Sequence, residues 1–137
     1  MTLLLMVVDV EAGQLRWASA GHDAPFIYDP DSPEGEPDLP LGVLAGASYE
    51  EMAWGPLRAG QILLSATDGV WEAKNAADEE FGRDRVRALI REHAARPARE
   101  IKRAILDAVE AFAVEQDDDI TLVVVKVLPD AVVEASA

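Results

Sequence analysis

The sequence contains no cysteine and only two histidines, His22 and His93. The lack of cysteine excludes disulfide bonds, thiol catalysis and zinc–thiolate sites, and two histidines are too few for a histidine-rich metal centre. No apolar run reaches the roughly 18 residues that a membrane-spanning helix needs. The N-terminal run 3–8 has no basic segment before it and is followed at once by Asp9, so it indicates a strand and not a signal peptide. We therefore expect a cytoplasmic protein with no membrane segment.

Basic residues are also scarce, with 12 lysines and arginines against 26 acidic residues and a formal net charge of −14. Such a negative field repels phosphate backbones, so nucleic acid is not an expected partner. It attracts divalent cations or a basic protein surface, although solubility alone also explains an acidic surface. The length of 137 residues and the apolar fraction of 50% suit one domain with a substantial core. We expect this domain to span residues 1–127, with a flexible tail over 128–137.

Apolar patterning predicts an α+β fold with antiparallel sheets, because several strands precede two helices and one strand follows them. The first strand, over 2–10, is an unbroken apolar run, which is typical of a strand buried on both faces. The proline-rich stretch 29–40 is expected to be an exposed loop. The remaining elements are a hairpin turn at Gly13, strands over 15–20, 25–28, 49–54, 61–65 and 120–127, and helices with apolar stripes at Val86, Leu89, Ile90 and at Ile101, Ile105, Val109, Phe112.

Carboxylates stand next to two of these strands. Asp68 follows the strand 61–65, and Asp118, inside the run Asp117–Asp119, precedes the strand 120–127. If the two strands pair in antiparallel fashion, the end of one and the start of the other meet at the same edge, and Asp68 and Asp118 come close together. Aspartate oxygens are the ligands that Mg²⁺ and Mn²⁺ prefer. Metal ions held in this way can activate water for attack on phosphorus.

Simpler interpretations exist for each of these residues. A Thr-Asp-Gly sequence is often an ordinary turn or a helix N-cap, and an acidic run is often a solvated loop. In the metal hypothesis, by contrast, Gly69 is expected to let the chain turn sharply beside the metal. His22 could act as a base, but a histidine in such a loop is more often an anchor. Neither a nucleophile elbow nor a phosphate-binding glycine loop is present.

Five segments in a fixed order strengthen the metal hypothesis. They are Ala20–Pro25, Leu39–Gly42, Thr67–Ala73, Phe81–Gly82 and Asp117–Leu122. This series resembles the C-terminal part of the PPM-type metal-dependent protein serine/threonine phosphatases, in the bacterial SpoIIE/RsbU-like branch. The resemblance covers residues 2 to about 127. It implies a partial α-β-β-α sandwich with antiparallel sheets and two adjacent helices, with Asp68 and Asp118 as ligands of Mn²⁺ or Mg²⁺.

The resemblance also implies an activity, namely hydrolysis of phosphoserine or phosphothreonine in a regulatory protein such as an anti-sigma-factor antagonist. The sequence departs from the family pattern at Asp23, where the family has Asn, and at Trp71, where it has Thr or Ser. An upstream Gly-Asp motif that supplies further metal ligands in the family has no counterpart here. We therefore expect weak metal binding and little activity from this chain alone.

An incomplete sandwich would leave apolar surface open, as along the run 3–8, and such surfaces promote association. We therefore expect a homodimer, or association with the missing N-terminal portion of the domain. Two other hypotheses stay open at this point. One is a non-catalytic interaction module that retains the phosphatase fold. The other is a small acidic domain, unrelated to phosphatases, that binds cations or a partner.

Overall fold

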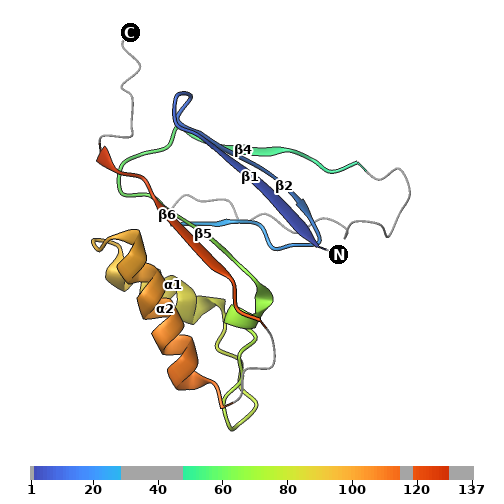
Figure 1. The fold of residues 1–137 in the computed structure, drawn as a ribbon, viewed down its shortest axis with the longest axis vertical. Helices are drawn as coiled ribbons and strands as arrows, with labels where there is room; N and C mark the ends of the chain where they lie inside the picture. Colours follow the sequence, from blue (N-terminus) through green and yellow to red (C-terminus); the bar gives the residue numbers. More distant parts are fainter. Residues whose placement is uncertain (1, 29–47, 115–118, 130–137) are drawn as a thin grey trace. The chain divides into compact units, whose positions relative to one another are not determined.

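The computed structural model describes residues 2–28, 48–114 and 119–129, and Figure 1 traces their path. The expected loop 29–40 and most of the expected tail lie outside these residues. Two three-stranded antiparallel sheets, β1-β2-β4 and β3-β5-β6, and two helices confirm the α+β prediction. The elements in chain order are β1 (Leu3–Asp9), β2 (Gln14–Ala20), β3 (Phe26–Tyr28), β4 (Met52–Trp54), β5 (Ile62–Ala66), the 3₁₀ turn η1 (Asp68–Val70), α1 (Arg83–His93), α2 (Ala98–Phe112) and β6 (Leu122–Lys126).

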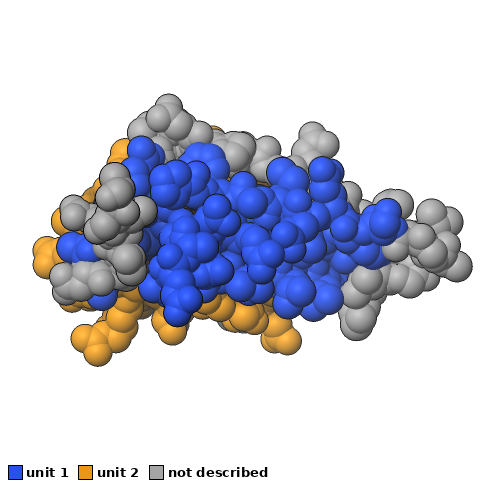
Figure 2. Space-filling model, turned by 90° about the horizontal axis from the view of Figure 1, so that it is seen from above, with its two compact units in different colours: residues 1–24, 33–61, 127–137 blue, residues 25–32, 62–126 orange. Residues whose placement is uncertain are grey.

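The chain divides into two compact units, which Figure 2 shows in different colours. Unit 1 comprises residues 1–24, 33–61 and 127–137, and unit 2 comprises residues 25–32 and 62–126. Each unit contains one of the two sheets, and both helices belong to unit 2. No helix within the described ranges is long and apolar enough to cross a membrane.

Unit 1 is built on the β1–β2 hairpin. The two strands pair from Leu3 opposite Ala20 to Asp9 opposite Gln14, and β4 adds a short edge strand beside β2. Gly13 closes the hairpin with a φ of +61°, a backbone conformation that glycine adopts without steric cost. The predicted turn at Gly13 and the strands on either side of it are therefore confirmed.

The prediction that the first strand is buried on both faces is wrong. Leu3, Leu5 and Val7 alternate along one face of β1 and are 48%, 62% and 42% exposed. A continuous apolar run reports that a strand has two apolar faces, but it does not report whether a second layer covers each face. The expectation of open apolar surface along 3–8 is confirmed.

Unit 2 has a closed core between its sheet and its helices. β5 is its central strand, with β3 on one side and β6 on the other. In Figure 1 the two helices lie along β5 and β6. Both predicted helical stripes point inward, because Val86 and Ile90 of α1 and Ile101, Ile105 and Val109 of α2 are buried. The cluster also contains Ile62, Leu64, Ala66, Val70 and Phe81.

Candidate metal centre

The predicted pairing of the strands that flank the two acidic motifs is confirmed. β5 and β6 are antiparallel, with Ile62 opposite Lys126 and Ala66 opposite Leu122. The ladder continues one pair further, because the Thr67 amide donates to the Thr121 carbonyl oxygen at 3.0 Å. The turn that carries Asp68 therefore begins beside the segment that leads into β6. Asp119 is the first described residue of that segment, and Asp118 lies outside the described residues.

Asp68 opens the right-handed 3₁₀ turn η1. Its carbonyl oxygen accepts hydrogen bonds from the amides of Trp71 at 3.0 Å and Glu72 at 2.9 Å. These two bonds hold the Asp68 backbone in place. The carboxylate is exposed, and its Oδ1 accepts the Gly69 amide at 3.1 Å. Gly69 is buried in this right-handed turn, so the conformational freedom that we expected of it is not what the turn uses.

Thr67 joins the two acidic segments through its side chain. Its Oγ1 donates to the Asp119 carbonyl oxygen at 2.9 Å and accepts the Thr121 amide at 2.9 Å. Sequence reasoning placed Thr67 in the motif but gave it no role. A hydroxyl directly before the aspartate was the available signal, but its partners are more than 50 residues away in the chain.

The donor set suits a hard divalent cation in part. Aspartate oxygens at the ends of neighbouring strands are the right type of ligand for Mg²⁺ or Mn²⁺. Within the described ranges, however, no group of three or more acidic or histidine side chains could hold a metal ion. Asp68 is thus the one predicted ligand whose surroundings the structure describes.

His22 belongs to unit 1 and makes local bonds. Ser19 Oγ donates to the His22 carbonyl oxygen, and the His22 ring Nδ1 lies 2.9 Å from the Asp23 carbonyl oxygen. Because a carbonyl only accepts, this distance assigns the proton to Nδ1. His22 and Asp23 are half-buried. These contacts are those of a loop anchor.

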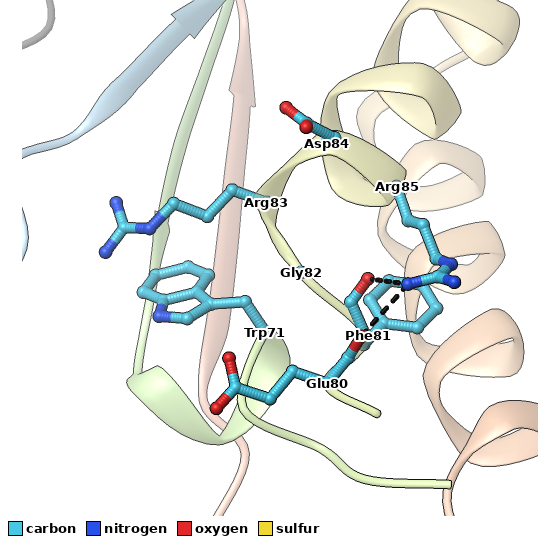
Figure 3. A pocket seen from close by; sticks show the side chains of 7 residues that line it. All are labelled: Trp71, Glu80, Phe81, Gly82, Arg83, Asp84 and Arg85. Carbon is cyan, nitrogen blue, oxygen red and sulfur yellow. Dashed lines mark hydrogen bonds between the residues drawn. The ribbon is translucent and has the colours of Figure 1, made fainter. Parts of the chain in front are cut away.

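Trp71 lines an open pocket of about 450 Å³ where α1 begins (Figure 3). The Arg83 guanidinium carbon lies 4.5 Å from the centroid of the indole ring, a cation–π contact. The other lining residues are Glu80, Phe81, Gly82, Asp84 and Arg85. Asp68, the predicted metal ligand, does not line this pocket. Trp71 does, although it is only three residues further along the chain.

Arg85 fixes the far wall of this pocket. Its Nη1 donates to the carbonyl oxygens of Glu80 at 2.9 Å and Phe81 at 2.7 Å, as the dashed lines in Figure 3 show. Its Nη2 donates to Glu79 Oε1 at 2.7 Å. This charged hydrogen bond is the main cause that lowers the pKa of Glu79, and a hydrogen bond from Asn75 lowers it further.

Residues 1–128 match the family of Stage II sporulation protein E (SpoIIE). The chain belongs to the SpoIIE family. The predicted relationship to PPM-type phosphatases of the SpoIIE/RsbU-like branch is thereby confirmed. A search of curated protein sequences returned no match.

Solved structures of SpoIIE-family and related phosphatase domains share this fold. The SiaA-PP2C domain of Pseudomonas aeruginosa is 24% identical with a TM-score of 0.71, covering 91% of this chain and 51% of its own. The RsbU and RsbW domains of a Mycobacterium tuberculosis protein are 24% identical with a TM-score of 0.75, covering 93% and 36%. The Bacillus subtilis SpoIIE phosphatase domain, presoaked with Mn, is 20% identical with a TM-score of 0.64, covering 93% and 56%.

These neighbours confirm the fold, and the family match places the chain in the SpoIIE-type phosphatase domain family. The chain spans roughly half or less of the length of each of these three structures. Divalent metals accompany the fold elsewhere, since a structure of RsbX was solved in complex with magnesium, at 18% identity and a TM-score of 0.55.

Proposed function

We propose that this chain supplies part of a divalent-metal centre that hydrolyses phosphoserine or phosphothreonine in a regulatory protein, with an anti-sigma-factor antagonist as the expected substrate. The observation that carries the proposal is the antiparallel pairing of β5 and β6, which continues to Thr67 and Thr121. This pairing brings the turn bearing Asp68 to the segment that begins at Asp119, the residue after Asp118 in the sequence.

Asp68 and Asp118 would hold the metal ion, Mn²⁺ or Mg²⁺. When bound, such a cation polarises phosphate oxygens and lowers the pKa of an adjacent water molecule. The Asp68 carboxylate is exposed at the start of a turn whose backbone is hydrogen-bonded. A cation from solvent can therefore reach it while the core stays in place. Asp119 has a different role, because its backbone carbonyl anchors the loop to Thr67.

This chain alone should bind the metal weakly and turn over slowly. The described residues contain no group of three or more metal-ligating side chains, and one or two carboxylates give a hard cation few of the six ligands it prefers. The remaining ligands would come from another segment of the phosphatase domain. The exposed Leu3, Leu5 and Val7 offer a surface for that association, with a second copy or with the part of the domain that this chain does not cover.

The test is Mn²⁺-dependent hydrolysis of a small aryl phosphate by the chain, beside Asp68→Asn and Asp118→Asn. We expect slow hydrolysis that requires Mn²⁺ and falls at least about 100-fold in both variants, because each removes a charge that binds the cation. Hydrolysis that survives either substitution contradicts the assigned site. The absence of any hydrolysis would mean that the chain is either a fragment without a working site or a non-catalytic interaction module.

A further inference from the structure

We infer that Thr67 is a positioning residue, whose hydroxyl takes the place of a backbone carbonyl so that the Asp68 turn can leave the sheet and stay tied to the Asp119 segment. This inference rests on the proposed function for its purpose. Its physical content stands on hydrogen bonds that the structure shows without any metal.

Antiparallel strands follow a fixed pattern of backbone hydrogen bonds. Two residues that face each other in a hydrogen-bonded pair exchange two bonds, each amide donating to the other's carbonyl. Thr67 and Thr121 make only the first of these, from the Thr67 amide to the Thr121 carbonyl oxygen at 3.0 Å. The Thr67 carbonyl oxygen instead accepts the Val70 amide at 3.1 Å, which closes the 3₁₀ turn bearing Asp68.

The Thr121 amide would then lose its partner in the ladder. Thr67 Oγ1 accepts this amide at 2.9 Å and so replaces the carbonyl that has turned away. The same oxygen donates its proton to the Asp119 carbonyl at 2.9 Å. One side chain thus satisfies a donor and an acceptor on the segment that enters β6, while the backbone of the same residue begins the turn.

Only a short side chain that both donates and accepts can make this pair of bonds. A threonine or serine hydroxyl has one proton and two lone pairs, so it meets both requirements. Valine has the shape of threonine but neither capacity. Serine keeps the hydroxyl and loses only a methyl group. These two substitutions therefore separate the hydrogen bonds from the packing of the side chain.

The experiment compares Thr67→Val and Thr67→Ser by amide hydrogen exchange in metal-free protein, with Thr2→Val as a control for losing an exposed hydroxyl elsewhere. Thr67→Val should speed exchange of the Thr121 amide about tenfold, the effect of losing one hydrogen bond, while Thr67→Ser and Thr2→Val should stay near wild type. Unchanged Thr121 exchange in Thr67→Val, or equal acceleration in Thr67→Ser, overturns the inference.

A second readout connects Thr67 to the acidic residues. With Mn²⁺ added, Thr67→Val should weaken cation binding about tenfold relative to Thr67→Ser, because the two segments are no longer held together. Wild-type Mn²⁺ affinity in a Thr67→Val protein whose Thr121 amide exchanges fast would show that the link does not serve the metal. If Asp68→Asn also leaves Mn²⁺ binding unchanged while the exchange result holds, the failure lies in the proposed metal site and not in the Thr67 link.

Discussion

Both sheets are built from mainly apolar strands, but they differ in how much of the apolar surface is covered. In unit 2, β5 has four of five residues buried, and the inward stripes of α1 and α2 close its core. In unit 1, Leu3, Leu5 and Val7 on one face of β1 stay between 42% and 62% exposed. Apolar composition therefore determines which faces can be buried, whereas the layers present determine which faces are buried.

Unit 2 thus has a packed core, whereas unit 1 has an exposed apolar strand face. The Asp68 turn directly follows β5, the central strand of unit 2. Ala66 before the turn and Val70 at its end are both buried in the core, so the turn is held in place by packing. The open strand β1 belongs to the other unit and carries association in our proposal. Function and assembly are thus assigned to different sheets, and each assignment can be tested separately.

The largest effect should come from truncating a leucine in each sheet. Leu64 in β5 is 2% exposed and Leu5 in β1 is 62% exposed. Leu64→Ala should lower the free energy of unfolding by about 3 kcal/mol through lost burial and a residual cavity, and Leu5→Ala by less than about 1 kcal/mol. Urea denaturation of the two variants measures this directly. At protein concentrations low enough to keep the chain monomeric, equal losses would contradict the exposure of Leu5.

The open strand can be tested for association in a second experiment. Leu5→Lys puts a charge on the exposed face of β1 and should weaken self-association by about tenfold or more, because a lysine must be desolvated in the interface. Val114→Lys is a matched control, since Val114 is 64% exposed but follows α2 in unit 2. Sedimentation equilibrium gives the dissociation constants. A wild-type chain that is monomeric at high concentration would refute the homodimer, and equal effects of both lysines would refute the assignment to β1.

A smaller effect is expected at the pocket of Figure 3. The Arg83 guanidinium stacks over the Trp71 ring, and exposed cation–π pairs stabilise a protein by about 0.5–1 kcal/mol. A double-mutant cycle with Trp71→Leu and Arg83→Gln should give a coupling energy of that size in the free energy of unfolding. A coupling energy of zero would show that the stack does not persist in solution.

The smallest effect should appear at Glu79, whose pKa Arg85 and Asn75 hold below its ordinary value of 4.5. A carboxyl whose pKa is lowered in the folded state stabilises the protein at pH values above its ordinary pKa. This contribution is lost as the pH falls through the pKa of the folded state. Wild type should therefore be slightly more stable than Glu79→Gln at pH 7. That advantage should disappear as the pH drops from 4.5 through the lowered pKa. Urea midpoints at a series of pH values measure it, and a pH-independent difference would contradict the ion pair.

Local patterns predicted much of the fold and part of the candidate site. The helical stripes, the hairpin at Gly13 and the pairing of β5 with β6 follow from periodicity, turn chemistry and strand order, and all are confirmed. Exposure of β1 could not be derived from the run 3–8, because a run does not record the layers above it. The role of Thr67 depends on Asp119 and Thr121, and no local pattern reports partners so distant in the chain.

We propose that Asp68 and the segment before β6 bind one divalent cation. The test is to titrate Mn²⁺ into the isotopically labelled chain and to follow the paramagnetic broadening of its amide resonances. A matched control is Asp107→Asn. Asp107 is an exposed aspartate of α2 that pairs with Arg103, so this substitution removes the same charge away from the site. We predict that amides of residues 67–70 and 119–121 broaden first in wild type and Asp107→Asn, and that this broadening is lost in Asp68→Asn. Broadening spread over the acidic surface, and unchanged in Asp68→Asn, would contradict the account.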